Sequence, residues 1–266
     1  YLVPKRNLTK NNLPFPYGNN EPKDTVFANV DYSKLTAAVN NAFDSKGQKK
    51  KRSRAVLVIY KDHIIAEKYD TGFTKNSKIL GWSMTKSITA TLFGILQKQG
   101  KYDINKPAPI PEWQKDERKK ITTNDLLHMN SGLEWEEAYD KICDATKMLF
   151  IAEDMGRVQL EKPAAFAPNT HWNYSSGTSN LLSYILRKQF KTHQEYLDFW
   201  YAQLIDRIGM HSMLIETDMV GNYVGSSYGW ATARDWAKFG LLYLHKGNWN
   251  GDQVFDPSWE NYVSTP

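Results

Sequence analysis

WSMTKSITATLFGILQKQG, residues 82–100, has the pattern of a long, buried helix. Its apolar side chains recur at the spacing of one helix face: Met84, Ile88, Leu92, Ile95 and Leu96. Gly100 is typical of the position that ends a helix. A helix this apolar predicts a central place in the fold, buried against other elements.

Ser83 and Lys86 stand at the start of this helix. Residues three apart share a helix face, with Cβ atoms roughly 5–6 Å apart, so the amine of Lys86 can reach the hydroxyl of Ser83 and accept its proton. The unpaired N–H groups of a first helical turn also favour developing negative charge. Ser83 is therefore a candidate nucleophile, and Lys86 is its candidate base.

The spacing alone is weak evidence, because chance gives roughly one or two Ser-x-x-Lys matches in a chain this rich in serine and lysine. Ser83 and Lys86 form the single match. Lys86 can act as a base only when neutral, and burial would have to lower its pKa from about 10.4. The alternative is an ordinary exposed lysine.

The rest of the chain predicts an α+β fold. Residues 1–30 suggest an irregular lead-in, residues 31–43 a helix, and residues 55–60 and 64–69 an antiparallel hairpin. From 105 to 225 the pattern predicts helices without clear strands, at 122–127, 145–155, 178–190 and 194–208. A last helix is expected at 233–245.

This order places a helical region within a sheet-bearing part. We expect residues 1–104 to form the lead-in, hairpin and central helix, residues 105–225 a helical insert, and residues 226–266 an incomplete return to the α/β part. Two strands make a poor sheet, so further strands are expected to follow Pro266.

A second motif, Tyr174-Ser175-Ser176-Gly177, precedes another apolar helix. A tyrosine hydroxyl facing Ser83 and Lys86 could share their proton and deliver it to a leaving group. Ser176 could hydrogen-bond Lys86 or the substrate. The alternative is a core tyrosine at a helix entry.

Taken together, the two motifs resemble those of the serine β-lactamase and penicillin-binding-protein superfamily, in its class C-like branch. The chain looks closest to 6-aminohexanoate-dimer hydrolases and related esterases. ITTNDLLHMNSGL at 121–133 and residues 225–251 are also similar to segments of that branch, so the resemblance covers roughly residues 50–266. It implies a β-lactamase/transpeptidase-like fold, with an antiparallel sheet flanked by helices.

The resemblance implies roles for five residues. Ser83 would be acylated, with its backbone N–H as half of an oxyanion hole, while Lys86 and Tyr174 would transfer protons. Ser176 stands in the family's asparagine place and, with Tyr139, would bind substrate.

The family's third motif, Lys- or His-x-Gly on a late strand, has one candidate, His245-Lys246-Gly247. Gly247 there reads as the end of a helix. We therefore expect the C-terminal strands of the family to be absent from this chain.

These features predict a serine hydrolase that acts on a small-molecule amide or ester through an acyl-enzyme, with no metal or organic cofactor. A β-lactamase, peptidase, amide-oligomer hydrolase and esterase all fit. The alternative is a non-catalytic ligand-binding or sensor protein on the same scaffold. The six histidines show no His-Glu-x-x-His spacing.

Composition adds limits. Of 266 residues, 41% are hydrophobic and 24% charged, and no apolar run approaches the ~20 residues of a membrane span. The basic cluster of residues 46–54 could bind an anionic partner, but without interleaved aromatics it indicates a solvated loop and no nucleic acid. Cys143, the only cysteine, excludes an internal disulfide. A periplasmic or secreted location follows from the resemblance, and a cytoplasmic one is left open, as is the oligomeric state.

Overall fold

The computed structural model describes residues 2–9, 11–18, 20–45 and 50–265. Lys46 and Lys49 of the basic cluster lie outside these ranges. The helices are α1 (Tyr32–Asn41), α2 (Met84–Lys98), α3 (Thr123–Leu127), α4 (Asp144–Phe150), α5 (Met155–Leu160), α6 (Ser176–Arg187), α7 (His193–Trp200), α8 (Ala233–Leu244) and α9 (Pro257–Ser264). The strands are β1 (Ala55–Tyr60), β2 (His63–Tyr69), β3 (Ile79–Leu80), β4 (Leu214–Ile215), β5 (Gly229–Ala231), β6 (Asn248–Trp249) and β7 (Asp252–Gln253).

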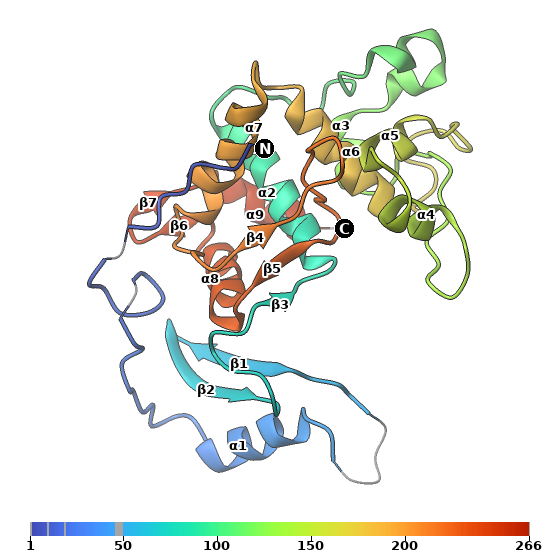
Figure 1. The fold of residues 1–266 in the computed structure, drawn as a ribbon. Coiled ribbons are helices and arrows are strands. Elements are labelled where there is room, and N and C mark those ends of the chain that lie inside the picture. The colour runs from blue at the N-terminus through green and yellow to red at the C-terminus, as the bar shows by residue number, and fades with distance from the viewer. Residues whose placement is uncertain (1, 10, 19, 46–49, 266) are drawn as a thin grey trace.

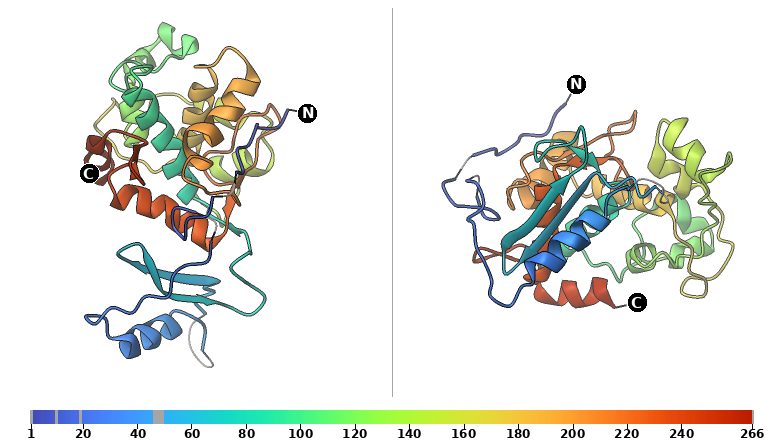
Figure 2. Two further views of the ribbon diagram at one scale, coloured as in Figure 1. Left: turned by 90° about the vertical axis from the view of Figure 1, so that its left-hand side faces the viewer. Right: turned by 90° about the horizontal axis from the view of Figure 1, so that it is seen from below.

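The predicted hairpin forms one layer of the molecule. β1 and β2 pair antiparallel around a two-residue turn, in which Lys61 and Asp62 both adopt positive φ, as the twist of a tight hairpin requires. α1 packs on β2 and α8 on β1. Figures 1 and 2 show the hairpin between these two helices.

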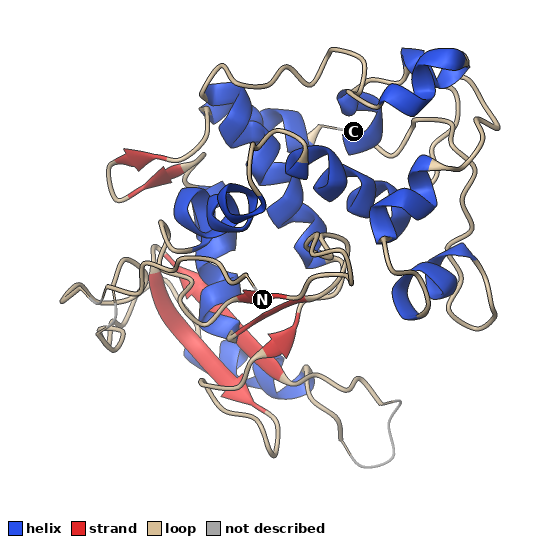
Figure 3. Cartoon of the chain, turned by 45° about the horizontal axis from the view of Figure 1, so that its top comes forward, coloured by secondary structure: helices blue, strands red, loops and turns tan. Residues whose placement is uncertain are grey.

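α2 runs through the centre of the helical part, as the sequence predicts (Figures 1 and 3). Its buried residues cover most of the helix surface: Thr85, Ile88, Thr89, Thr91, Leu92, Phe93, Gly94, Ile95 and Leu96. The large apolar ones among them belong to one core that also takes side chains from α6, α7, α8 and α9. Fully burying each large apolar side chain stabilises the fold by roughly 1.5–3 kcal/mol. Because these side chains pack against several helices, the position of α2 is strongly fixed.

A small sheet fixes the start of α2. β3 and β4 pair antiparallel with β5, in the order β3-β5-β4. Just after β3, the N–H of Gly81 donates to the carbonyl of Gly229 over 2.8 Å. In the first turn of α2, the hydroxyl of Thr85 accepts from the N–H of Gly229 over 3.1 Å. The turn carrying Ser83 is therefore tied to β5 on both sides.

The segment from 105 to 225 is largely helical, with two 3₁₀ turns, η1 (Pro111–Lys115) and η2 (Glu117–Lys120). α3 begins at a capping box, in which Thr122 and Asp125 each bond the other's backbone N–H. α6 packs against α2, α3, α4 and α5. A second, smaller apolar cluster that includes Trp135, Cys143 and Met148 lies under the α4–α5 region.

The irregular lead-in is anchored along the molecule. Arg6 forms an ion pair with the buried carboxylate of Asp206 at 2.6 Å, and its guanidinium lies 4.1 Å from the ring centre of Tyr201. Figure 1 shows the lead-in running from the helical part down to α1. These contacts hold residues that have no regular secondary structure of their own.

Three expectations about the helical segment were wrong. Residues 145–155 form two helices, because Asp154 caps a new helix by accepting from the N–H of Arg157. The helix expected to run to residue 208 is α-helical only as far as Trp200. A π-helical turn, η3 (Tyr201–Ile205), follows it, and there the N–H of Asp206 bonds the carbonyl five residues back. The two-residue strand β4 lies in the segment expected to lack strands, and it is too short to leave an alternating pattern.

The end of α8 is as predicted, and α9 was missed. Gly247 has φ +82° and its N–H closes on the carbonyl of Leu242 over 2.8 Å, which ends the helix. α9 follows an Asp256 cap with Pro257 in the first turn, a start signal that the sequence does contain.

The contact between α2 and α9 gives a test of this packing. A Cβ on Gly94 would lie 2.6 Å from the Trp259 ring, whereas a Cβ on the exposed helical Gly240 would meet nothing within 4 Å. Gly94→Ala should lower the free energy of unfolding by about 1–3 kcal/mol through overpacking. Gly240→Ala, the matched control, should raise it by about 0.5–1 kcal/mol. Urea denaturation measures both, and equal effects would contradict the packing described.

Candidate active site

Ser83 is presented by a strained turn. Trp82, directly before it, has φ +46°, a left-handed conformation that a bulky residue rarely adopts. Gly81 leaves room for the ring of Trp236, which a Cβ there would overlap at 2.2 Å. The turn between β3 and α2 therefore leaves Ser83 exposed at the first helical turn, and the Ser83 side chain makes no capping bond to its own helix.

The amine of Lys86 lies at the centre of three oxygens. Its Nζ is 3.1 Å from Ser83 Oγ, 3.1 Å from Ser176 Oγ and 2.9 Å from the carbonyl oxygen of Ser226. These partners come from the residue directly before α2, from the first residue of α6 and from the loop before β5. The structure thus brings Ser83, Lys86 and Ser176 together, although Ser176 lies 90 residues from Lys86 in the chain.

Burial changes the proton affinity of this amine. Desolvation lowers the pKa of Lys86 from 10.5 to about 8, and the negative charge of Glu137 opposes the shift. A substantial fraction of Lys86 is therefore neutral in mildly alkaline solution. This is the protonation state in which it can accept a proton from Ser83.

Tyr174 lies against the same amine. Its ring centre is 5.1 Å from Lys86 Nζ, and the side chain is half-buried. Among the described residues, its hydroxyl makes no hydrogen bond to Ser83 or Lys86. The contact seen is therefore between the cation and the ring face.

Tyr139 is 60% exposed and reaches the site through Glu137, which the sequence analysis did not select. The Tyr139 hydroxyl donates to Glu137 Oε1 over 2.5 Å. The Ser176 hydroxyl donates to the same oxygen over 2.5 Å. Burial opposes ionisation of Glu137, but its hydrogen bonds from Ser176, Tyr139 and Trp135 outweigh that effect and hold the pKa of its carboxyl below the usual value.

A cleft of about 310 Å³ opens beside Ser83 and Lys86. α3 and the residues after it contribute His128 and Met129, which belong to the 121–133 segment, and α9 contributes Tyr262. The wall is mixed in polarity, with apolar side chains beside the serine and lysine. The cleft is large enough for a small organic acyl group.

The backbone N–H of Ser83 meets no hydrogen-bond acceptor among residues 2–9, 11–18, 20–45 and 50–265. It lies at the first turn of α2, where the helix dipole favours negative charge. It is therefore available to a ligand oxygen.

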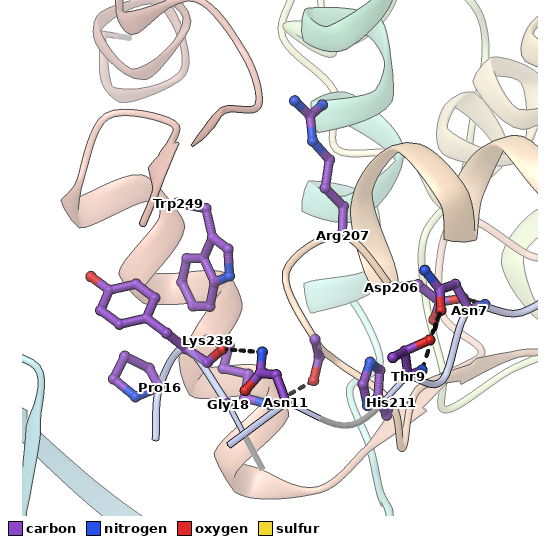
Figure 4. Close-up of a pocket in the computed structure, with 12 residues that line it drawn as sticks. Asn7, Thr9, Asn11, Pro16, Gly18, Asp206, Arg207, His211, Lys238 and Trp249 are labelled. Atoms are coloured by element: carbon purple, nitrogen blue, oxygen red, sulfur yellow. Dashed lines mark hydrogen bonds between the residues drawn. The ribbon is translucent and has the colours of Figure 1, made fainter. Parts of the chain in front are cut away.

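A second hollow of about 90 Å³ lies between the lead-in and α8 (Figure 4). Polar groups in its wall bond one another. The N–H of Asn7 donates to Asp206 over 2.8 Å, and Lys238 Nζ donates to the carbonyl of Gly209 over 2.5 Å. Ser83 and Lys86 do not line it, so the cleft beside Ser83 is the better candidate site.

Other candidates from the sequence lie elsewhere. His245 caps α8 and bonds Asp62 in the hairpin turn over 2.7 Å, and it does not line the cleft beside Ser83. Cys143 is buried and donates to the carbonyl of Ala138 over 2.8 Å. Within the part of the chain that the structure describes, no group of His, Cys, Asp or Glu is arranged to hold a metal ion, and no helix has the length and apolarity to cross a membrane.

A family model described as Beta-lactamase matches residues 39–264, most of the chain. The chain belongs to the beta-lactamase family. This family consists in general of serine hydrolases acting on amides and esters. The resemblance to β-lactamases and penicillin-binding proteins is thereby confirmed.

Solved structures of beta-lactamase-like proteins show the same fold. A protein described as a 6-aminohexanoate-dimer hydrolase from Bacillus anthracis has a TM-score of 0.71 at 21% identity, covering 85% of this chain and 61% of its own. A β-lactamase from Bacteroides dorei has a TM-score of 0.66 at 19% identity, covering 88% and 68%. A penicillin-binding protein from Bacillus halodurans has a TM-score of 0.59 at 16% identity, covering 80% and 74%.

At these identities the likeness shows the fold alone, and it confirms the predicted α+β, β-lactamase/transpeptidase-like class. The chain spans 61% of the length of the Bacillus anthracis structure. A search of curated protein sequences finds no match.

The buried lysine of this beta-lactamase family chain predicts a pH-dependent stability. The unfolded chain keeps the Lys86 proton up to a pKa of 10.5, and the folded chain releases it near 8, so between these values the unfolded state binds more protons. Wild-type stability therefore rises with pH across this window, by on the order of 3 kcal/mol. Lys86→Met lacks this gain.

We expect Lys86→Met to be more stable than wild type near pH 7, with the advantage shrinking toward pH 10.5. Urea denaturation at several pH values measures the difference. Lys34→Met, at a lysine whose side chain is 87% exposed, is the control and should follow the wild-type pH dependence. A constant gap between Lys86→Met and wild type would contradict the lowered pKa.

Proposed function

We propose that this chain carries the catalytic serine of a hydrolase that cleaves amide or ester bonds through an acyl-enzyme on Ser83. The observation that supports this most is the position of Lys86, whose Nζ lies 3.1 Å from Ser83 Oγ and whose pKa is lowered by burial. A neutral amine at hydrogen-bond distance from a hydroxyl is an activating base.

Acylation would then proceed as follows. Lys86 takes the hydroxyl proton while Ser83 Oγ bonds to the substrate's carbonyl carbon. The carbonyl oxygen becomes negative, and we propose that the free N–H of Ser83 binds it. The bond to the amine or alcohol breaks, and the proton held by Lys86 passes to this leaving group, with Tyr174 as the proposed carrier.

Hydrolysis of the ester returns the site to its starting state. Water adds to the acyl carbon and gives a proton to Lys86. The bond from this carbon to Ser83 Oγ breaks, and the proton returns to the serine. No atom in either step comes from a metal or organic cofactor.

The cleft limits the substrate only by class. Its volume of about 310 Å³ and its mixed wall suit a small acyl group with apolar and polar parts. We propose Ser176 and Tyr139 as substrate contacts from the resemblance: both donate to Glu137, and Ser176 Oγ lies 3.1 Å from Lys86 Nζ, although neither is among the residues that line the cleft. A β-lactam, a peptide, an amide oligomer and a small ester all present a carbonyl of the required kind.

Labelling with a fluorophosphonate tests the nucleophile. Ser83 Oγ should displace fluoride and form one phosphonyl adduct, visible in intact mass. The labelling rate should rise with pH through about 8, because Lys86 must lose its proton first. Lys86→Ala should slow labelling by about 10²–10⁴-fold.

Two serines provide the controls. Ser83→Ala should form no adduct, whereas Ser87→Ala, which removes a neighbouring serine of the same cleft, should label like wild type. An unlabelled wild type that is folded by circular dichroism would contradict the nucleophile assignment.

Exposure to a penicillin and to small amide and ester substrates separates the hydrolase from the sensor alternative. An adduct that forms and clears with product release supports the hydrolase. A mass adduct that persists without turnover favours a sensor on the same scaffold.

A further inference from the structure

Glu137 is a carboxylate whose charge acts on the amine of Lys86, and it takes no part in the proposed acylation and hydrolysis steps. It lies in the loop before α4, and its side chain is half-buried. Both of its oxygens are occupied. Oε2 accepts from the backbone N–H of Ser176 over 2.8 Å and from the indole N–H of Trp135 over 2.5 Å. Oε1 accepts from the hydroxyls of Ser176 and Tyr139, each over 2.5 Å.

These bonds fix where the hydroxyl hydrogen of Ser176 lies. A serine hydroxyl has one hydrogen to donate and lone pairs to accept with. An ionised carboxylate can only accept, so the Ser176 hydrogen must point to Glu137. Ser176 Oγ can then interact with Lys86 only as an acceptor, over the 3.1 Å that separates them.

The same count of donors and acceptors fixes the orientation of the neutral amine of Lys86. It has two hydrogens and one lone pair. The carbonyl oxygen of Ser226, 2.9 Å away, can only accept, and Ser176 Oγ is restricted to accepting by Glu137. Both amine hydrogens are therefore used, and the lone pair is left for the third neighbour, Ser83 Oγ.

We propose that Glu137 is a positioning residue that turns the lone pair of neutral Lys86 toward the hydroxyl of Ser83 by holding the hydroxyl hydrogen of Ser176. The proposal rests on the proposed function, since it explains how the base is aimed. It assigns Glu137 no contact with substrate, because its four acceptor positions are filled by the protein.

Glu137 also acts on Lys86 through its charge. The other titratable groups around the amine are the phenols of Tyr174 and Tyr139, with His128 and Tyr262 in the wall of the cleft. Of these groups, Glu137 is the one whose negative charge raises the pKa of Lys86. Removing its charge should therefore lower that pKa further.

Glu137→Gln separates orientation from packing, because it keeps the shape of the side chain. The backbone and indole donors at Oε2 require an oxygen, so the amide NH₂ would take the place of Oε1. There it would donate to Ser176 Oγ and release the serine hydrogen to bond the lone pair of Lys86. That lone pair would no longer be free for Ser83.

Two measurements on Glu137→Gln test the proposal. The plateau rate of Ser83 labelling by a fluorophosphonate at high pH should fall about tenfold or more, since the neutral base is misdirected. The titration midpoint of Lys86, followed by NMR of ¹³Cε-labelled lysine with Lys86→Arg for assignment, should move to lower pH. A merely structural role would produce neither the lower midpoint nor a slow plateau in a folded protein.

The controls use neighbouring residues. Glu136→Gln removes the adjacent carboxylate, which pairs with Lys141, and should leave rate and midpoint at wild-type values. Ser176→Ala removes the group through which Glu137 acts. In that background, Glu137→Gln should change the plateau rate by less than twofold, although the midpoint should still fall.

The outcomes separate the two proposals. A wild type that is not labelled at Ser83 overturns the proposed function. A labelled wild type with an unchanged plateau rate in Glu137→Gln overturns only the role of Glu137, even where the midpoint moves. An unchanged Lys86 midpoint overturns it as well, as does a full Glu137→Gln effect in the Ser176→Ala background.

Discussion

The burial of α2, which carries the amine of Lys86 in its first turn, shapes the whole site. The helix is apolar on most of its surface, so it must lie inside the molecule, and Lys86 is carried in with it. A buried amine loses hydration and needs partners. The three oxygens at 2.9–3.1 Å provide them, and they come from the N-cap of α2, from α6 and from the loop before β5. The contacts that compensate for burial therefore also assemble the site.

Charge and hydrogen-bond direction have separate effects in this site. Desolvation alone would leave a neutral lysine with its lone pair free to face any of three neighbours. The carbonyl of Ser226 and the carboxylate of Glu137 can only accept hydrogen bonds. The carbonyl takes one amine hydrogen directly, and the carboxylate, by holding the hydroxyl hydrogen of Ser176, makes Ser176 the acceptor of the other. The same carboxylate limits how far the pKa of Lys86 falls. Glu137 thus raises the proton affinity of the base against the effect of desolvation, and in our proposal it also fixes the orientation of that base.

Sequence patterns predicted what is local or carries a motif. The periodicity of α2, the hairpin and the end of α8 follow from neighbouring residues, and the spacing of Ser83 and Lys86 places them on one face. The motif at the start of α6 pointed to Tyr174 and Ser176, and the resemblance then implied their roles. Glu137 was not predicted as a site residue, because it contacts Ser176 across 39 residues and its neighbours in the sequence give no sign of such a contact. The carbonyl of Ser226 was not predicted either, because every residue has a backbone carbonyl and the sequence cannot single one out. β4 is two residues long and leaves no period to read.

The distribution of these groups links chemistry to packing. Ser83 and Lys86 belong to a helix held by β5 and the core, whereas Glu137 and Ser176 belong to the segment between residues 105 and 225. Hydrogen-bond direction depends on distances of 2.5–3.1 Å, so a shift of α6 along α2 of about 1 Å would break the path from Glu137 to Lys86 while leaving both helices intact. Substitutions that loosen the α2–α6 contact should therefore reduce the reactivity of Ser83 before they unfold the protein, and the base would lose its direction before it loses its burial.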